Sequence, residues 1–203
     1  KILKRNNRRN CNFLLGPKYS LFNTSYNTKE TVPSDFVFYN GGSGNLLIYE
    51  DIIKRLSKSK IKNFKIILIV GPYSKNYRII LKKFKNYKNI IILNKPENIL
   101  NYIKKTKLFI SSAGISMFES SYLKLPSLLI KMHDNQNLLD EDYEKLGHFF
   151  LLDKNDLKNT DKIINLILLM FENRNQIKKM MFSKNIKLKN IQLNFIKNLG
   201  NKI

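Results

Sequence analysis

The sequence has 203 residues, 43% of them apolar and 11% aromatic, which is enough for one globular domain with a sizeable core. Its single cysteine, Cys11, excludes an intrachain disulfide, and no apolar run approaches the roughly 18 to 20 residues that cross a bilayer. The net charge of +22 comes from scattered lysines that lack accompanying aromatics, which favours codon bias over a nucleic-acid interface. We expect a cytoplasmic protein that needs no metal or cofactor.

The chain starts with a basic stretch, residues 1–10, which we interpret as a cut edge and not as a targeting peptide. The next segment, Asn12–Asn23, is apolar and broken by a Gly-Pro pair, and a polar stretch, Thr24–Ser34, follows it. We therefore interpret residues 1–34 as an incoming strand and linker that remain from an interdomain region.

From there, apolar β-branched runs alternate with stretches of helical period. The predicted strands are Phe36–Tyr39, Lys65–Val70, Ile90–Leu93, Leu108–Ser111, Ser127–Ile130 and His148–Leu152. The predicted helices between them are Leu46–Ser59, Asn76–Phe84, Ile99–Lys104, Ser116–Leu123 and Asn135–Leu146. Continuously apolar strands that alternate with helices indicate a parallel sheet covered on both faces. We expect an α/β domain over residues 35–155, with a Rossmann-like, doubly wound sheet of about six strands.

After the last predicted strand the alternation stops. Leu157–Phe171 and Gln176–Leu199 both have helical period, and no strand separates them. Residues 156–203 are therefore predicted to be a C-terminal helical extension.

The first candidate binding loop follows the first predicted strand and reads Asn40-Gly41-Gly42-Ser43-Gly44-Asn45. Ligands of an open α/β sheet bind at the carboxyl ends of the strands, and glycines let the backbone approach an anion closely. The loop fits neither the Walker A nor the GxGxxG pattern, and its glycines could simply turn the chain. Its place between a strand and a helix favours phosphate binding.

The second candidate loop contains Ser112, Ala113 and Gly114, and the next helix carries Glu119 in its first turn. A carboxylate there could accept hydrogen bonds from both hydroxyls of a ribose. It could equally be a solvated glutamate that the helix dipole favours. The spacing leaves both interpretations open.

The third candidate loop includes Asn135 and Gln136, whose amides suit sugar hydroxyls or a diphosphate. In the same loop, His133 could act as a general base, but an exposed loop residue is the favoured interpretation. His148 is predicted to be a packed core residue. The loop Gly71–Ser74 is predicted to be structural, although it could line the crevice. The sequence pattern indicates no catalytic triad, so the catalytic residues are unknown.

Four segments stand out in chain order: FLLGPKYSLF, a strand that ends in GGSG, ISSAGISMFESSYLKLPSLLI and HDNQ. Together they resemble the C-terminal domain of the GT-B-type UDP-sugar hydrolases of nonulosonic acid biosynthesis. Within that group, the chain is similar to the UDP-2,4-diacetamido-2,4,6-trideoxy-β-L-altropyranose hydrolases of the pseudaminic acid pathway. It is also similar to the spore-coat polysaccharide glycosyltransferase-like proteins, and more distantly to the UndPP-MurNAc-pentapeptide GlcNAc transferases. The resemblance covers roughly Phe13–Leu152 and implies the C-terminal half of a GT-B fold.

The resemblance implies a UDP-sugar site. Gly41, Gly42 and Ser43 would contact the phosphates, the loop Lys95–Ile99 would lie beside uracil through its backbone, and Glu119 would hold the ribose. GGSG replaces the GGSD-like sequence of the hydrolases, which leaves the side-chain contacts of this loop open. The expected binding residues are Gly41, Gly42, Ser43, Gly44, Pro96, Glu97, Asn98, Ser112, Ala113, Gly114, Glu119, Asn135 and Gln136.

The resemblance also implies that the parent enzyme removes UDP from an activated amino sugar with water as the acceptor. The histidine that activates water belongs to an N-terminal domain that nothing in this sequence matches, so that domain is the expected partner. The first alternative is the donor-binding domain of a glycosyltransferase with a donor of the UDP-GlcNAc type, whose basic helices could contact anionic lipid. The second alternative is a non-enzymatic nucleic-acid-binding module.

Overall fold

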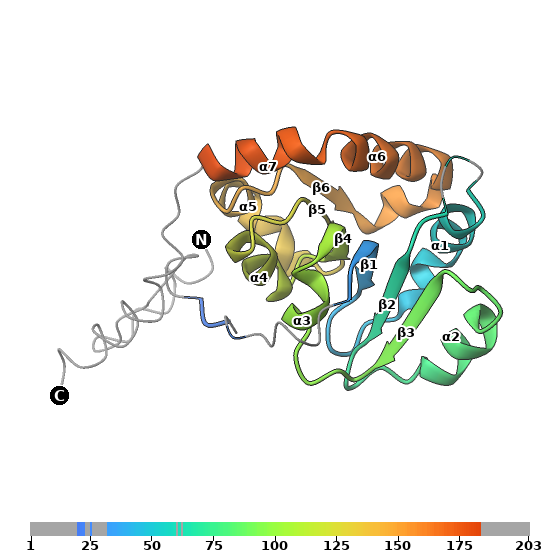
Figure 1. Ribbon diagram of the computed structural model, residues 1–203. Helices are drawn as coiled ribbons and strands as arrows, with labels where there is room; N and C mark the ends of the chain where they lie inside the picture. Colours follow the sequence, from blue (N-terminus) through green and yellow to red (C-terminus); the bar gives the residue numbers. More distant parts are fainter. Residues whose placement is uncertain (1–19, 23–24, 26–31, 60, 62, 184–203) are drawn as a thin grey trace, which may run out of the picture. The chain divides into compact units, whose positions relative to one another are not determined.

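The computed structural model describes residues 20–22, 25, 32–59, 61 and 63–183. The chain divides into two units, and the larger one spans Phe22–Ile186. The larger unit holds the sheet and the helices described below (Figure 1). Within the described residues, no helix is long and apolar enough to cross a membrane. Most of the predicted incoming strand lies outside the described residues, and residues 20–22 form no regular element.

Strands and helices alternate along the larger unit, as the apolar runs of the sequence predicted. The strands are β1 (Ser34–Tyr39), β2 (Ile66–Val70), β3 (Ile90–Asn94), β4 (Thr106–Ser112), β5 (Ser127–Lys131) and β6 (Phe150–Asp153). The α-helices are α1 (Glu50–Ser57), α2 (Tyr77–Phe84), α3 (Leu100–Ile103), α4 (Ser116–Tyr122), α5 (Asp140–Lys145), α6 (Thr160–Glu172) and α7 (Arg174–Ser183). The described residues also include the 3-10 helices η4 (Leu46–Tyr49), η5 (Asp134–Leu139) and η6 (Lys154–Lys158).

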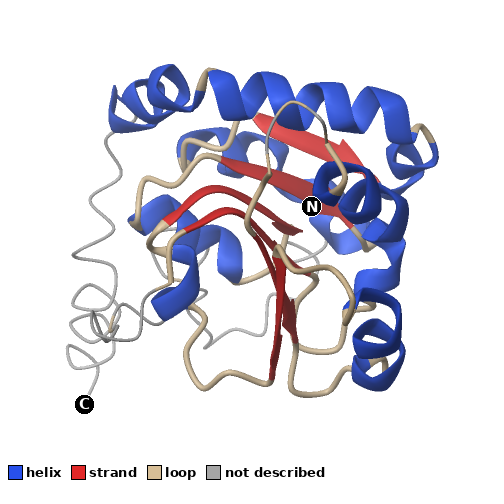
Figure 2. Ribbon diagram, turned by 45° about the vertical axis from the view of Figure 1, so that its right-hand side comes forward, coloured by secondary structure: helices blue, strands red, loops and turns tan. Residues whose placement is uncertain are grey.

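The strands form one 6-stranded parallel sheet in the order β3-β2-β1-β4-β5-β6. Phe36 of β1 pairs with Ile66 of β2 on one side and with Leu108 of β4 on the other. Helices lie on both faces of the sheet (Figure 2), which explains why β2 is apolar and buried at every position. The predicted Rossmann-like α/β fold is confirmed, and the strand order reverses direction between β1 and β4.

Alternate residues of each central strand enter different apolar clusters, because successive side chains of a strand point to opposite faces. Phe36 and Phe38 of β1 belong to a cluster that includes residues of α1, α2, α6 and α7. Val37, between them, belongs to a second cluster with Leu100 and Ile103 of α3. Helices α6 and α7 therefore complete the same core as the sheet.

The boundaries of several elements differ from the prediction at positions where a polar side chain forms a hydrogen bond with the backbone. The predicted helix Leu46–Ser59 begins as the 3-10 helix η4, whose first turn is capped by Asn45 Oδ1 at 2.9 Å from Leu47 N. The predicted helix Leu157–Phe171 is divided at Asn159, whose side chain caps α6 through Lys162 N at 3.1 Å. The predicted helix Asn135–Leu146 also divides, into η5 and α5. Of the predicted helix Gln176–Leu199, only the part within α7 lies among the described residues.

His148 precedes β6, which begins at Phe150 and not at the predicted position. The turn before it contains Gly147 at φ 88°, a conformation that favours glycine. The imidazole is buried and its Nε2 lies 2.8 Å from the Met117 carbonyl oxygen. Burial lowers the pKa of His148 to about 4, so the ring is neutral at physiological pH. The prediction of a packed core residue is confirmed.

Candidate functional site

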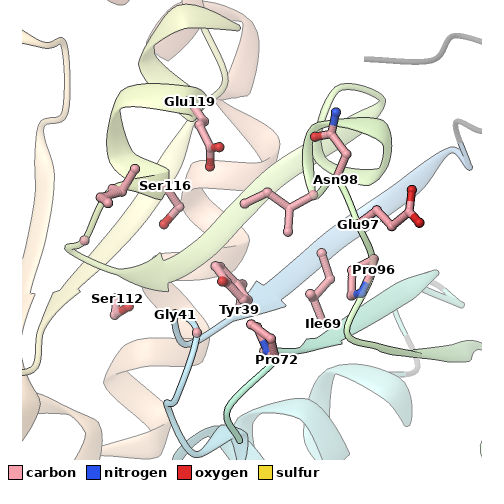
Figure 3. Close-up of a pocket in the computed structure, with 15 residues that line it drawn as sticks. Tyr39, Gly41, Ile69, Pro72, Pro96, Glu97, Asn98, Ser112, Ser116 and Glu119 are labelled. Atoms are coloured by element: carbon pink, nitrogen blue, oxygen red, sulfur yellow. The ribbon is translucent and has the colours of Figure 1, made fainter. Parts of the chain in front are cut away.

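A cavity of about 490 Å³ opens at the carboxyl ends of β1 and β4, where the strand order reverses. This is the place where open α/β sheets bind their ligands, because the loops on the two sides diverge there. Figure 3 shows side chains from the ends of β1, β2 and β4 and from α4 around this space. The residues that line it are Tyr39, Gly41, Gly42, Ile69, Gly71, Pro72, Pro96, Glu97, Asn98, Ile99, Ser112, Gly114, Ile115, Ser116 and Glu119.

The glycine-rich loop after β1 forms one wall of the cavity. Gly41 has φ 73°, a left-handed conformation, and lines the cavity together with Gly42. At Gly44, a Cβ would lie 1.6 Å from the carbonyl oxygen of Asn40, so the tight turn itself requires glycine at this position. The side-chain Nδ2 of Asn40 donates to Asn45 O at 3.0 Å and closes the turn. Gly41 and Gly42 thus present backbone to the cavity, whereas Gly44 and Ser43 do not line it.

The loop after β2 packs directly against this glycine-rich turn. A Cβ at Gly71 would lie 2.3 Å from Gly41 O and 2.4 Å from Gly42 O. Tyr73 N donates to Gly42 O at 2.8 Å, which ties the two loops together. This loop therefore supports the glycine-rich turn, and Gly71 and Pro72 also line the cavity, so the structure shows both roles that the sequence suggested for it.

We expect Gly71→Ala to destabilise the protein by roughly 1 to 3 kcal/mol, because the added methyl group must displace backbone oxygen atoms. Urea denaturation followed by circular dichroism would measure this loss. Gly114→Ala is the matched control for stability, since a Cβ there meets nothing within 4 Å. Equal stability of the two variants would show that the two loops do not approach as closely as the structure has them.

The loop after β4 and the start of α4 form the opposite wall. The hydroxyl groups of Ser111 and Ser116 form a hydrogen bond with an Oγ–Oγ distance of 3.0 Å, and Gly114 N donates to Ser112 O at 2.8 Å. These contacts within the turn fix its conformation. Ser112, Gly114 and Ser116 line the cavity, whereas the side chain of Ala113 is buried outside it. The small residues leave the space above the switch point open.

Glu119 lies on α4 with its carboxylate directed into the cavity (Figure 3). The residue is only 8% exposed, which contradicts the interpretation as a solvated helix-start glutamate. Within the described residues, its carboxylate has no hydrogen bond or ion pair. Burial raises the pKa of Glu119 to about 7. The pKa of Tyr39 is raised by its own burial and then by the charge of Glu119. The cavity therefore holds one buried carboxylate, that of Glu119, whose oxygens accept no hydrogen bond from the part of the chain that the structure describes.

The loop after β3 forms the third side. Lys95 adopts φ 52° and donates from its backbone N to Val70 O at 2.9 Å, which turns the chain over the end of β2. Asn98 Oδ1 accepts from Leu100 N at 3.0 Å at the start of α3. Pro96, Glu97 and Asn98 line the cavity as predicted, but the Glu97 carboxylate is exposed and points away from Glu119 (Figure 3). Ile99 also lines the cavity.

The loop after β5 contributes nothing to the cavity lining. Asn135 is exposed, and Gln136 is buried with its Oε1 accepting from Met132 N at 2.6 Å and from His133 N at 3.2 Å. The amide oxygen of Gln136 thus fastens its own loop, an interaction that residue type alone does not reveal. His133 is exposed, as predicted.

Tyr39 and Ile69 also line the cavity, but they were not predicted as site residues from the sequence. Both lie within strands, one at the end of β1 and one near the end of β2, so their apolar character marked them as core. A predicted strand order would have indicated them, because side chains at the switch point face the crevice. In the described part of the chain, no three His, Cys, Asp or Glu side chains gather in a way that could hold a metal ion.

Comparisons with known proteins identify the family and the fold. The family model described as the glycosyltransferase family 28 C-terminal domain matches residues 36–198. A UDP-N-acetylglucosamine--N-acetylmuramyl-(pentapeptide) pyrophosphoryl-undecaprenol N-acetylglucosamine transferase of Pelagibacter ubique is 30% identical over 137 residues, 63% of this chain and 38% of that protein. The uncharacterized protein MJ1062 of Methanocaldococcus jannaschii is 26% identical over 145 residues, 66% of this chain and 30% of that protein.

Among solved structures, Acinetobacter baumannii MurG superposes with a TM-score of 0.61 at 12% identity, covering 89% of this chain and 55% of the MurG chain. At this identity the superposition shows a shared fold. The chain spans about a third of the length of the curated relatives it matches.

Proposed function

Because the chain belongs to the glycosyltransferase family 28 C-terminal domain family, we propose that it is the donor-binding half of a glycosyltransferase and holds the UDP part of a UDP-sugar. The Pelagibacter ubique relative is by name an N-acetylglucosamine transferase, which supports a donor of the UDP-GlcNAc type. The comparisons favour this alternative over the hydrolase of nonulosonic acid biosynthesis that the sequence motifs suggested, since they give no support for hydrolysis.

The observation that carries the proposal is the pairing of a backbone-lined wall with a buried carboxylate across the switch point. Gly41 and Gly42 offer the close backbone approach that a diphosphate needs. On the other wall, Glu119 offers two acceptor oxygens to the ribose hydroxyls. The loop Pro96–Ile99 would then lie beside the base.

Catalysis by this site requires a second wall that carries the acceptor. We assign that wall to the part of the relatives that this chain does not match, since the chain spans only about a third of their length. The acceptor hydroxyl would replace water as the attacking group, and the leaving UDP would be met by backbone N–H groups instead of a metal ion. The proposed role of the described chain is donor binding.

Isothermal titration of the chain with UDP, UMP and ADP tests this proposal, at about 0.15 M salt so that charge attraction is screened. We expect UDP to bind more tightly than UMP, because the second phosphate reaches the glycine-rich loop. We expect ADP to bind more weakly than UDP, because the loop Pro96–Ile99 selects the base. Equal affinities for UDP and ADP would contradict a uridine-specific site and leave only the shared fold.

A further inference from the structure

A second concave feature lies at the other end of the sheet, beside the amino ends of β4 and β5. Its volume is about 180 Å³. Among the described residues that line it, none is acidic, and the cationic ones are Lys104, Lys107, Lys124, Arg174 and Lys178. They come from the α3–β4 connection, β4, the α4–β5 turn and α7, so the fold and not the local sequence brings them together. We call this group of side chains the basic pocket.

The aromatic ring of Phe171 holds two of these cations in place. Lys107 Nζ lies 5.5 Å from the centroid of the ring, and the Arg174 guanidinium lies 5.0 Å from it. The ring is itself fixed by the core, since its centroid lies 5.3 Å from those of Phe36 and Phe64. Arg174 Nη1 also donates to Phe171 O at 2.7 Å. The Lys107 and Arg174 side chains thus both lie against one ring that the core holds rigid.

Lys124 enters the same pocket from a turn whose backbone conformation favours glycine. Its φ is 52°, which is uncommon for a residue with a Cβ. Its backbone N donates to Ser121 O at 3.0 Å, and its Nζ lies 3.4 Å from Met181 O. Burial lowers the pKa of Lys124. The fold therefore retains a partly buried lysine at a position where glycine would be less strained.

We propose that the basic pocket binds a phosphate group. Arg174 has five N–H donors in a planar fork, of which one is used by Phe171 O, and lysine ammonium groups on several sides complement a compact anion. Lys107 is paired with Asp35 at 2.8 Å, and Asp35 Oδ2 also accepts from Lys65 N, which fixes this lysine at the rim. The volume suits a single phosphate headgroup and not a nucleotide. The phosphate could belong to a lipid headgroup or to a soluble molecule.

The basic pocket is separate from the proposed donor site. Strand β4 has 7 residues and runs from Thr106, which lines the basic pocket, to Ser112, which lines the donor cavity. At about 3.3 Å per residue this distance is roughly 20 Å. A phosphate bound at one site cannot contact the other, so the two sites can be tested independently.

Titration of the 203-residue chain with inorganic phosphate, followed by the amide resonances in 1H–15N spectra, localises the binding. We expect shifts at Lys107, Lys124 and Lys178, which saturate with phosphate concentration. Shifts at Gly41 and Gly42 would report the donor site separately, so failure at one site does not imply failure at the other. The variant Lys124→Gln/Lys178→Gln should lose the shifts at the basic pocket and keep those at the glycines.

Sedimentation with vesicles distinguishes the source of the phosphate. We compare vesicles of phosphatidylcholine alone with vesicles that also contain phosphatidylglycerol. Removal of two cations from a surface that contacts anionic lipid should weaken binding roughly 25-fold, at about fivefold for each cation. The control Lys82→Gln/Lys85→Gln removes the same charge from exposed positions of α2 and its C-terminal end, and should bind like the wild type.

A loss of vesicle binding that is specific to the Lys124→Gln/Lys178→Gln variant supports a lipid headgroup. Saturable phosphate shifts at the basic pocket without vesicle binding support a soluble phosphate compound. If Lys124→Gln does not fold, Lys178→Gln alone and the wild-type shifts still decide the question. Absence of both effects, or an equal loss in the control variant, would overturn the proposal.

Discussion

Glu119→Gln is expected to weaken UDP binding and to stabilise the protein at the same time. The amide keeps the shape of the side chain, but it has no charge and only one oxygen to accept from the two ribose hydroxyl groups. The expected loss of binding free energy is roughly 1 to 3 kcal/mol, or about 5- to 150-fold in affinity. Stability rises because a buried carboxylate that has no partner among the described residues is replaced by a neutral group. A residue retained at a cost in stability is expected at a binding site.

The gain in stability should depend on pH with a defined sign. Burial raises the pKa of Glu119 from its ordinary value of 4.5 to about 7, so the folded protein holds a proton between these values that the unfolded chain has released. The carboxyl group is therefore tolerated best below pH 4.5, and its burial destabilises the fold increasingly as the pH rises to 7. Each pH unit in this window is worth about 1.4 kcal/mol. We expect a gain of roughly 3 kcal/mol at pH 8 and little gain at pH 4.5.

Denaturant unfolding of both proteins at the two pH values measures this difference. The low pKa of the buried His148 acts in the opposite direction, but it is present in both proteins and cancels. Glu172→Gln, which removes an exposed carboxylate at the end of α6, is the matched control and should change neither affinity nor stability. UDP affinity should also fall in the wild type as the pH drops below 7, and not in Glu119→Gln. Unchanged affinity in the folded variant would remove Glu119 from the ribose site.

The fold could be predicted from the sequence because its central strands are short, continuously apolar runs. The run Ile66–Val70 is apolar at every position and flanked by polar residues, so its burial on both faces follows from composition alone. Boundaries could not be predicted where a single polar contact decides them. Asn159 follows η6 and caps α6. His148 lies in the turn before β6 and contacts Met117 O of α4. The first contact is local, between Asn159 and Lys162, whereas His148 and Met117 are 31 residues apart and only the tertiary structure brings them together.

The candidate site was predictable to the extent that it lies in loops. Gly41, Gly42, Gly114 and Glu119 follow strands, and the rule that ligands bind at the carboxyl ends of strands placed them together. Asn135 and Gln136 also follow a strand, β5, yet neither lines the cavity, and the Gln136 amide oxygen accepts from Met132 N and His133 N in its own loop. The strand order decides which loops converge, and the sequence pattern does not specify that order.

The largest loss of stability is expected for Phe171→Ala. The ring lies 5.3 Å from each of two other aromatic rings, Phe36 of β1 and Phe64 before β2, and those two rings are 4.9 Å apart. Removal of one member of this trio leaves a cavity that the sheet cannot fill, which costs roughly 3 to 5 kcal/mol. Leu169→Ala on the same helix is the control, since Leu169 is 57% exposed and its loss should change the stability by about 0.5 kcal/mol or less.

Denaturant unfolding of these two variants also tests where the domain ends. The sequence pattern placed a boundary at residue 155, which makes α6 part of an extension, whereas Phe171 shares an apolar cluster with strands β1, β2, β4 and β5. If α6 is integral to the fold, Phe171→Ala lowers the free energy of the single unfolding transition, and the basic pocket loses the ring that holds Lys107 and Arg174. A variant that unfolds in two steps, with the sheet unchanged in stability, would instead establish α6 and α7 as a separable cover.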